Sequence, residues 1–564
     1  MLRPWWEQVP ERLEYELEAL RSARVEFSRR DEEFVKGVLV LDLRVPLDGE
    51  VFALRAEFPD FFPYVRPEVY AEDLSLDRHQ NPFGRNLCLL GRRSDEWEPE
   101  MTLAQLVTEQ LRQVLAANQI SEPSSLSAIE EHQGEPITAF YSYAQNGAAL
   151  IEGSAALSEL PDGGRAVFAT AGNNDGVLVV RELRGPDGAV LYRMSEAIVA
   201  SFSNLKPGRW VRLDRAIRKE TGAEFDAELV ERRPALRSRN YVGDDDFVLI
   251  AFPDELQWLK QGLNWVLLVR RKIKSKASFK NDERYLLRVQ RIGQEDRSAR
   301  VPEASALATK RVAVFGLGCL GAPVALELAR CGLAELRLLD PDVVDAATAV
   351  RWPFGLPVAG QLKVEAVALF IKQHYPWTRV RHEAHRLGQP KPGPRQRPDM
   401  VVISEVLESC DLLVDATAEF GIQRMLSDLA LQHGVPYVGL YATLGGVGGR
   451  VFRLARGRTG CWRCIRLYEL ERTIAEPPSR EEESLVQPAG CDSRTYTGGS
   501  FDLAEISALA SRLIVSTLVE DERSDFSWDV ATVSLRNGDG RRTEPVWQVA
   551  PSPAHATCAL CPAR

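Results

Sequence analysis

The chain has 564 residues and carries 80 acidic against 70 basic side chains, which gives a formal net charge of −10. This acidic balance gives no sign of general affinity for nucleic acids, whose phosphates attract basic surfaces. No uninterrupted apolar run reaches membrane-spanning length, so we expect no site in a membrane. A chain of this length is expected to form about three to four domains, each with a core of its own.

The N-terminal part shows a pattern of one helix, three strands and a second helix. Apolar residues at helical spacing predict an amphipathic helix over residues 10–20. Three runs of strand character follow, at residues 33–43, 50–57 and 66–70. A proline-containing bend at 58–63 joins the second and third runs, and a second helix is predicted over 102–117.

A cysteine lies between the last predicted strand and the second helix. His79-Gln80-Asn81 precedes Cys88, and Trp97 follows. The whole order resembles the ubiquitin-conjugating fold over about residues 1–120. The resemblance implies that Cys88 forms a thioester and that Asn81 donates to the oxyanion when an amine attacks it. The family's His-Pro-Asn stands here as His79-Gln80-Asn81, and we expect a structural hydrogen bond, not chemistry, from His79.

The middle of the chain carries no motif with recognisable chemistry. A turn-rich linker at 121–127 precedes short β-branched runs such as 176–183, which the turn sequence Gly-Pro-Asp-Gly at 185–188 ends. We therefore expect a small β-rich domain that spaces two catalytic units. A basic cluster at 270–280 is interpreted as a solvated face, with a docking surface for an acidic partner as the alternative.

The sequence GLGCLG at 316–321 is the strongest local signal in the chain. It follows a strand-like run at 310–315 and precedes a helical pattern at 322–330, a further strand at 336–339 and Asp340. This is the layout of a nucleotide-binding βαβ unit, in which glycines let the backbone approach phosphate at a helix N-terminus. Taken alone, the motif would favour a dinucleotide-dependent dehydrogenase.

Residues downstream of the glycines point to adenylation instead. Arg351 and Lys363 follow Asp340, and two Cys-x-x-C pairs stand at 461–464 and 558–561. From about residue 310 to 564 this series resembles the ThiF/MoeB and ubiquitin-activating adenylyltransferase superfamily, which uses ATP to adenylate a C-terminal carboxylate. The alternative interpretation of Arg351 and Lys363 is a pair of solvated surface charges. The resemblance implies that Asp340 contacts the ribose and that the two cations contact the triphosphate. The full set of nucleotide-binding residues that it implies is Gly316, Gly318, Gly321, Asp340, Asp342, Arg351, Lys363 and Asp415.

The expected magnesium site departs from the family pattern. The family's metal-binding aspartate falls at Ala418 in the sequence Asp-Ala-Thr-Ala-Glu at 415–419, and Thr348 replaces a common asparagine. Glu419 or Asp342 would then coordinate Mg²⁺ through oxygen.

The nine cysteines fall into three classes. The N-terminus lacks a signal peptide, so we expect a reducing cytoplasm and thiols that act as ligands, nucleophiles or packing groups. The doubled Cys-x-x-C spacing favours one structural zinc ion, with redox activity of one pair as the alternative; the predicted ligands are Cys461, Cys464, Cys558 and Cys561. Cys319, Cys331 and Cys410 are interpreted as buried small hydrophobic residues.

Cys491 stands in a loop rich in small residues, just before a helical run at 501–519. Such a cysteine can be exposed, and a helix N-terminus lowers its pKa. The loop resembles the catalytic-cysteine loop of bacterial activating enzymes, which implies that Cys491 takes the acyl group from AMP. A loop cysteine of no consequence is the alternative.

These inferences combine into a multidomain α/β and α+β chain. We expect a ubiquitin-conjugating-like domain at 1–145, a β-rich domain at 146–302 and a Rossmann-like adenylation domain with zinc knuckles at 303–564. The combination resembles the activating–conjugating fusion proteins of CBASS anti-phage operons. This resemblance implies ATP and Mg²⁺ as cofactors and a homodimeric protein. It implies that the activated partner is a ubiquitin-like carrier or the C-terminus of a cGAS/DncV-like nucleotidyltransferase. The acyl group would then pass to an amine-bearing target protein. The rival interpretation is a sulfur-carrier adenylyltransferase with a non-catalytic conjugating-like module.

Overall fold

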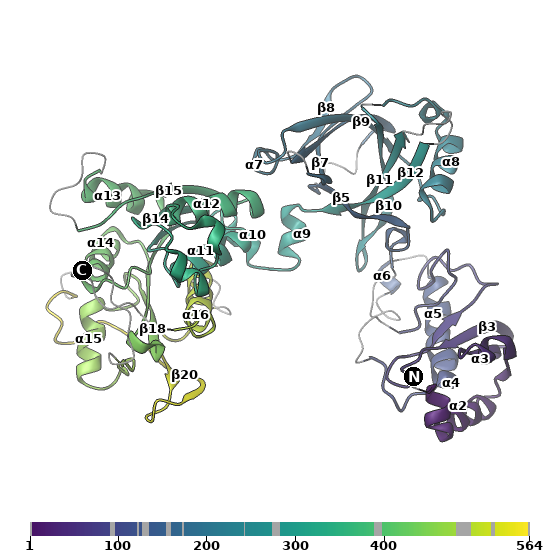
Figure 1. Ribbon diagram of the computed structural model, residues 1–564, viewed down its shortest axis with the longest axis horizontal. Coiled ribbons are helices and arrows are strands. Elements are labelled where there is room, and N and C mark those ends of the chain that lie inside the picture. The colour runs from purple at the N-terminus through teal and green to yellow at the C-terminus, as the bar shows by residue number, and fades with distance from the viewer. Residues whose placement is uncertain are drawn as a thin grey trace. The chain divides into compact units, whose positions relative to one another are not determined.

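The protein was analysed as a computed structural model (Figure 1). The structure describes residues 3–90, 96–120, 123–126, 135–153, 160–171, 174–241, 243–272, 282–388, 397–480, 498–519 and 525–561. The chain divides into two compact units, one of Met1–Met194 with Phe202–Arg291 and the other of Ser195–Ser201 with Ile292–Arg564. The first unit contains two separate sheets and the second unit contains one.

The N-terminal sheet of the first unit is antiparallel, with the strand order β1-β2-β3-β4. Its strands are β1 (Glu26–Arg29), β2 (Leu39–Leu47), β3 (Glu50–Phe58) and β4 (Glu68–Tyr70). Its helices are α1 (Trp5–Gln8), α2 (Pro10–Ser22), α3 (Asp31–Val35), α4 (Leu103–Gln105) and α5 (Leu111–Asn118), the last two joined by a π-helical turn at Leu106–Gln110. Apolar residues of α1, α2, α4 and α5 pack against β2 and β3 in one core.

The strand expected at residues 33–43 is wrong at its start. Residues 31–35 form the short helix α3, and β2 begins only at Leu39. Three acidic residues in the first turn of α3 favour a helix there, because they lie at its positive end. Gly37, with φ of +84°, then ends the helix in a conformation that side-chain-bearing residues rarely adopt.

The second sheet of this unit closes on itself, because β5 pairs with both β12 and β7. The strand order is β5-β12-β11-β10-β9-β6-β7-β8. The strands are β5 (Tyr143–Ile151), β6 (Gly163–Ala171), β7 (Asn174–Arg184), β8 (Val190–Arg193), β9 (Asn204–Arg212), β10 (Asp245–Gln257), β11 (Lys260–Lys272) and β12 (Asp282–Arg291), and helix α8 (Gly222–Arg232) packs against them. The strands of this closed sheet span residues 143–291, so most of them fall in the range 146–302 for which the sequence predicts a β-rich domain.

The basic cluster at 270–280 is not a solvated face at its first residue. The Arg270 side chain is fully buried and binds the carboxylates of Asp226 and Asp246 at 2.5 and 2.9 Å. Arg271 alternates to the other side of β11, where it is half-exposed and binds Asp245. A buried guanidinium without such partners would carry a large desolvation penalty. Lys272 is exposed at the end of β11, and the lysines of the cluster beyond it lie outside the described residues.

The sheet of the second unit has the order β15-β14-β13-β16-β17-β18-β19-β20, parallel from β15 to β17 and antiparallel beyond. Its strands are β13 (Arg311–Phe315), β14 (Glu335–Leu339), β15 (Arg379–Glu383), β16 (Leu412–Asp415), β17 (Tyr437–Ala442), β18 (Gly448–Leu454), β19 (Val530–Arg536) and β20 (Arg542–Ala550). The chain leaves β13 toward β14 and β15 and returns to the other side of β13 with β16. Such a reversal in strand order opens a crevice at the carboxyl ends of the strands.

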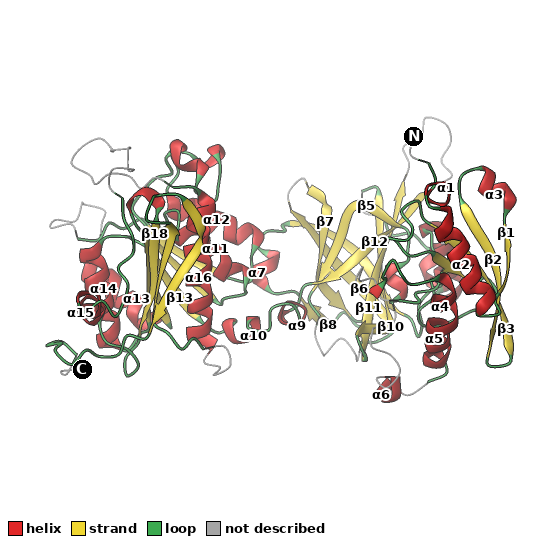
Figure 2. Ribbon diagram, turned by 90° about the horizontal axis from the view of Figure 1, so that it is seen from below, coloured by secondary structure: helices red, strands yellow, loops and turns green. Residues whose placement is uncertain are grey.

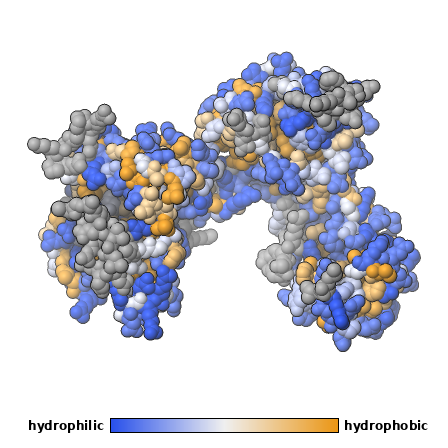
Figure 3. Space-filling view, viewed as in Figure 1, coloured by the Kyte–Doolittle hydropathy of each residue, from blue (hydrophilic) through white to orange (hydrophobic). Residues whose placement is uncertain are grey.

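Helices cover both faces of this sheet (Figure 2). The helices are α9 (Gln294–Ser298), α10 (Ala304–Leu307), α11 (Gly321–Arg330), α12 (Lys363–His374), α13 (Asp399–Ser409), α14 (Phe420–His433), α15 (Trp462–Leu470) and α16 (Ser500–Val519). Helices α11, α12 and α16 build the core on one face, and α13, α14 and α15 build the core on the other. Within the described ranges, no helix is long and apolar enough to cross a membrane. Hydrophilic residues cover most of the surface seen in Figure 3.

Candidate functional site

The glycine turn after β13 is shaped by three different requirements. Gly316 has φ of +84°, and a Cβ there would lie 2.7 Å from the backbone of Ala416. A Cβ on Gly321 would lie 1.9 Å from the Gly316 carbonyl oxygen, so the start of α11 packs directly on the turn. A Cβ on Gly318 would meet nothing within 4 Å, so this residue borders open space. Two glycines therefore build the turn, and the third leaves room beside it.

Asp340 ties the end of β14 to the glycine turn. Its side chain is buried; one oxygen accepts from the Leu317 amide at 2.6 Å and the other from the Asp342 amide at 2.8 Å. Burial raises the pKa of Asp340, and nearby Lys363 opposes that rise. Each carboxylate oxygen retains further lone-pair capacity for a ligand hydroxyl.

A cavity of about 770 Å³ opens at this edge of the sheet. Its size lies in the range of small-molecule and cofactor sites. The sequence-predicted residues that line it come from four segments of the chain, and they are Gly316, Gly318, Asp340, Asp342, Arg351 and Lys363. The Lys363 Nζ lies 2.9 Å from an Asp342 oxygen, and Arg386 lies 3.3 Å from the other oxygen. The cavity is thus a mixed-charge site that offers cations to an anionic ligand.

Like Gly321, Asp415 is a predicted nucleotide residue that is not among the described residues lining the cavity. Its fully buried carboxylate accepts from Thr417 and, at 3.0 Å, from the Tyr437 hydroxyl. Burial raises the pKa of Asp415 to about 6. Its position supports a role in shaping the turn at 416–419, which does line the cavity.

Besides Asp340, which binds the glycine turn, two carboxylates of the described residues in this cavity are available for a magnesium ion. Ala418, which replaces the family's aspartate, has φ of +58°, and the neighbouring Glu419 is exposed at the start of α14. Glu419 and Asp342 both line the cavity. Oxygen ligands of this kind suit Mg²⁺, so the residues present fit that ion.

The end of β15 adds a wall that the sequence interpretation missed. His385, Arg386 and Leu387 line the cavity, and His385 Nε2 lies 2.8 Å from an Asp399 oxygen. In the sequence, His-Glu-Ala-His at 382–385 resembles only the zinc-protease motif His-Glu-x-x-His, and its two histidines are too close together for that motif. The usable signal is that β15 is the next parallel strand beside β14, so its carboxyl end meets the same crevice.

The framework cysteines are less uniform than predicted. Cys410 is buried, and burial raises its pKa to about 12. Cys319 and Cys331 are only partly buried, contrary to the expectation of full burial. Cys319 borders the cavity, where burial raises its pKa and Arg351 and Lys363 oppose the rise.

The four predicted zinc ligands converge at one point. All four Sγ atoms lie within 4.8 Å of one another, and the separations Cys461–Cys464, Cys461–Cys558 and Cys464–Cys561 are 3.9, 3.7 and 3.3 Å. A tetrahedral zinc with Zn–S bonds of about 2.3 Å needs sulfur separations of about 3.8 Å. A Cβ on Gly460 would lie 2.6 Å from the Cys464 Sγ, so a glycine is needed beside the cluster. These residues fit a structural zinc ion.

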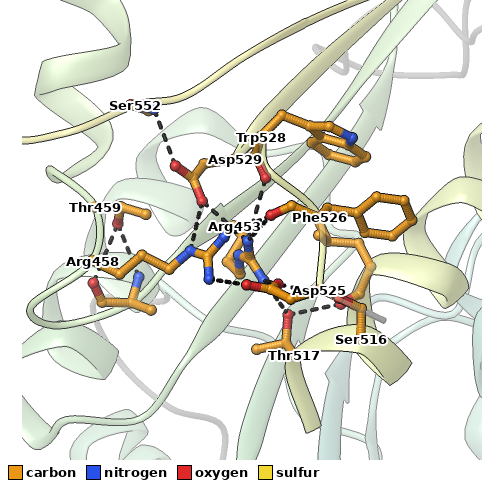
Figure 4. Close-up of polar contacts among 12 residues, drawn as sticks. Arg453, Arg458, Thr459, Ser516, Thr517, Asp525, Phe526, Trp528, Asp529 and Ser552 are labelled. Carbon is orange, nitrogen blue, oxygen red and sulfur yellow. Dashed lines mark hydrogen bonds and ion pairs between the residues drawn. The ribbon is translucent and has the colours of Figure 1, made fainter. Parts of the chain in front are cut away.

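A partly buried ion-pair network supports the segments that carry these cysteines (Figure 4). Arg453 of β18 binds Asp525 and Asp529 at 2.9 and 3.2 Å, and Arg458 binds the same two carboxylates. The other Asp529 oxygen accepts from the Ser552 amide, and the Ser552 carbonyl accepts from the amide of Gly460. The network therefore fixes the chain on both sides of the cysteine cluster.

In the first unit, residues 79–88 form a hairpin that carries Cys88. The Cys88 amide donates to the His79 carbonyl at 2.8 Å, and Gln80 pairs with Leu87 one step further on. Gln80 and Leu87 are buried, whereas Cys88 and Asn81 are partly exposed, as expected for alternation along a strand. The Cys88 thiol donates to the Leu90 carbonyl at 3.2 Å.

Gln80 replaces the proline of the family pattern with a structural anchor. Its Nε2 donates to the carbonyls of Ala71 and Leu74, and its Oε1 accepts from the Leu76 amide at 2.8 Å. The hairpin that presents Asn81 is therefore fixed without the proline. Cys491 lies outside the described residues, so its role stays a prediction.

The fold and these sites define a ubiquitin-conjugating-like domain joined to a Rossmann-like adenylation domain. Residues 286–558 match the model of the ThiF family, and residues 21–150 match that of prokaryotic E2 family B. The chain belongs to the family of E2-like and ThiF fusions that includes the proteins y4qC and y4oA of Sinorhizobium fredii. It is 33% identical to y4qC over 96% of this chain and 95% of that protein, and 30% identical to y4oA over 98% and 97%.

Other similarities are confined to parts of the chain. A stretch of 175 residues is 31% identical to the adenylyltransferase and sulfurtransferase uba4 of Aspergillus terreus, covering 29% of this chain and 33% of that protein. The crystal structure of E. coli MccB with ATP matches with a TM-score of 0.35 and 15% identity, over 47% of this chain and 74% of that chain. The resemblance to the ThiF and ubiquitin-conjugating families is confirmed by the two family matches.

Proposed function

We propose that this protein activates the C-terminal carboxylate of a partner protein with ATP and transfers it, through two cysteine thioesters, to an amine of a target protein. The observation that supports this most is the cavity at the carboxyl ends of β13 and β14. Two of the predicted glycines border it, together with Asp340, Arg351 and Lys363. The ThiF match over the same residues supports ATP as the substrate bound there.

In the first step, a carboxylate oxygen of the partner attacks the α-phosphate of ATP, and pyrophosphate leaves. Both reactants are anionic, so the step requires fixed positive charge near the phosphates. Lys363 and Arg351 supply it. Asp342 binds the Lys363 ammonium at 2.9 Å in the wall of the cavity. Asp342 and Glu419 would hold Mg²⁺, which neutralises phosphate charge when bound.

In the second stage, the Cys491 thiolate attacks the acyl carbon of the adenylate, and AMP leaves. The Cys88 thiolate then attacks the Cys491 thioester, and the Cys491 thiolate leaves. Finally, an amine attacks the Cys88 thioester; it loses a proton, the Cys88 thiolate leaves and an amide forms. Asn81 is the proposed donor to the oxyanion of this last step.

The activated partner is a ubiquitin-like carrier or the C-terminus of a cGAS/DncV-like nucleotidyltransferase, and the setting is anti-phage defence of the CBASS kind. We also propose a homodimer, as is usual for ThiF-type domains. The rival function is sulfur-carrier adenylation with a non-catalytic conjugating-like module. The similarity to uba4, an adenylyltransferase and sulfurtransferase, favours that rival.

The test is exchange of labelled pyrophosphate into ATP, with a ubiquitin-like protein ending in Gly-Gly and a cGAS/DncV-like nucleotidyltransferase as separate substrates. Cys88→Ala and Cys491→Ala should both retain this exchange, because adenylation precedes both thioesters. Cys491→Ala should block every thioester, whereas Cys88→Ala should trap a reducible band on Cys491 with no conjugate. Undiminished conjugation by Cys88→Ala would support the rival. Product formed by Cys491→Ala would mean direct transfer from the adenylate to Cys88.

A further inference from the structure

The hairpin that carries Cys88 has its tip at residues 82–85. Across the hairpin, the Asn81 amide donates to the Asn86 carbonyl at 2.9 Å, and the Arg85 amide donates to the Asn81 carbonyl at 3.0 Å. A two-stranded hairpin of this length is marginally stable by itself. Gln80 and the pairing of Asn86 and Leu87 with the end of β4 hold its middle to the N-terminal sheet, and its tip and base lie beside the closed sheet.

At the tip, the Phe83 side chain packs into a core that belongs to the closed sheet. Its ring lies 6.1 Å from the ring of Tyr141, which in turn lies 5.4 Å edge-on from the ring of Phe225 in α8. The Tyr141 hydroxyl donates to the Ile217 carbonyl at 2.7 Å, so the surface that receives Phe83 is itself fixed. Phe83 is the one residue of the hairpin that joins this cluster within the described residues.

At the base of the hairpin, a largely buried ion pair joins the hairpin segment to the closed sheet. Arg78, immediately before the hairpin, binds Glu255 of β10, and their side chains are 17% and 7% exposed. The other Glu255 oxygen accepts from the Leu259 amide at 2.7 Å, which orients the carboxylate. A second ion pair, 2.5 Å long, joins Arg218 of the closed-sheet domain to Asp77 just before the hairpin. The side chains of Arg218 and Asp77 are 51% and 86% exposed. Exposed pairs of this kind contribute little, whereas a buried charge that loses its partner is strongly unfavourable.

The tip also controls the orientation of Asn81. The Asn81 Oδ1 accepts from the Phe83 amide at 2.9 Å and from the Gly84 amide at 3.1 Å. Because its oxygen is held by the tip, the Asn81 side chain has its Nδ2 group as the donor for other acceptors. Anchoring of Phe83 in the closed-sheet core is thereby transmitted to this amide.

We infer that the closed-sheet domain is part of the conjugating site: it fixes the Cys88 hairpin through Phe83 and Glu255 and so positions Asn81 for transfer of the acyl group to an amine. Phe83 and Glu255 are positioning residues, since neither touches the thioester. The inference rests on the proposed function for its chemical consequence, but the fixing of the hairpin is independent of that chemistry.

The kinetic test uses the full chain with Phe83→Ala and Glu255→Gln, and Arg218→Ala as the matched control on the exposed pair. Loading of Cys88 should remain close to wild type, because it does not use Asn81. In single-turnover discharge of the loaded thioester to free lysine, the rate constant at saturating lysine should fall on the order of 10- to 100-fold. The lysine concentration that gives half of this rate should change little. Phe83→Leu should recover most of the rate, and Arg218→Ala should keep all of it. Discharge by Phe83→Ala and Glu255→Gln at the wild-type rate would overturn the inference.

A second measurement separates this inference from the relay itself. Hydrogen exchange of the amides of residues 81–88 should accelerate at least tenfold in Phe83→Ala and Glu255→Gln, with no change in β2 and β3. Cys88 should also alkylate faster with iodoacetamide in both variants. If wild type forms no thioester on Cys88, the proposed function fails while these two readouts still test the positioning. Unchanged exchange and alkylation would refute the positioning even if the relay is correct.

Discussion

The Lys363 ammonium lies 2.9 Å from the Asp342 carboxylate and 4.0 Å from that of Asp340, at the first residue of α12. Two acids in the cavity wall therefore hold the cation that we propose binds the triphosphate. We expect Lys363→Met to lower pyrophosphate exchange by about 10²- to 10³-fold, the usual effect of losing one charge-stabilising donor. Lys372→Met, on the exposed last turn of the same helix, is the control and should exchange at the wild-type rate. Normal exchange by Lys363→Met would remove Lys363 from the site.

Gly318 and Gly321 should fail in different ways when replaced by alanine. In Gly321→Ala the new methyl group would meet the Gly316 carbonyl, so we expect a loss of about 1–3 kcal/mol or more of unfolding free energy. In Gly318→Ala the methyl group meets no protein atom, so stability should change by less than about 0.5 kcal/mol while ATP affinity falls. Denaturant unfolding and calorimetric titration with ATP measure the two effects. Tight binding of NAD in place of ATP would contradict the adenylation proposal itself.

The cysteine cluster should hold one zinc ion per chain. A closed four-thiolate site is structural, so Cys558→Ser should lose zinc and lower the unfolding temperature more than it perturbs nucleotide binding. Metal analysis by mass spectrometry and thermal unfolding are the measurements. Cys331→Ser, a partly buried cysteine outside the cluster, should retain the zinc. A zinc content near zero in folded, active protein would exclude the site.

Asp415 should make stability depend on pH in a direction opposite to that of most carboxylates. Burial raises its pKa to about 6, above the unfolded value of about 3.9. The folded protein therefore binds this proton more tightly, and the resulting stability is complete below about pH 4 and is lost as pH rises through about 6. Asp415→Asn keeps an oxygen for Thr417 and a polar contact for Tyr437 but has no proton to lose.

We therefore expect the stability of wild type relative to Asp415→Asn to fall between about pH 4 and pH 6, by at most about 1.4 kcal/mol per pH unit. Urea unfolding of both proteins over this range measures the difference. A constant difference across the range would mean that Asp415 does not change protonation there.

The features of this protein that depend on local pattern could be predicted from its sequence. The spacing of Gly316, Gly318 and Gly321 between a β-branched run and a helical run predicted the βαβ unit, because strand and helix periods are set by near neighbours. The doubled Cys-x-x-C spacing likewise predicted the cluster in which Cys461 and Cys558 lie 3.7 Å apart.

The burial of individual side chains and the identity of their neighbours could not be predicted from local pattern, and they became known from the folded chain. Arg270 looked like part of a solvated cluster, yet Asp226 and Asp246 of distant elements bury it as an ion pair. Asp415 looked like a nucleotide ligand, yet Tyr437 of the adjacent strand encloses it. No local pattern marks Phe83, whose environment is built by the closed sheet. The environment of such a side chain depends on partners that are far away in the sequence. A buried polar group is stable only when those partners compensate the free-energy cost of its burial, and a local pattern does not reveal them.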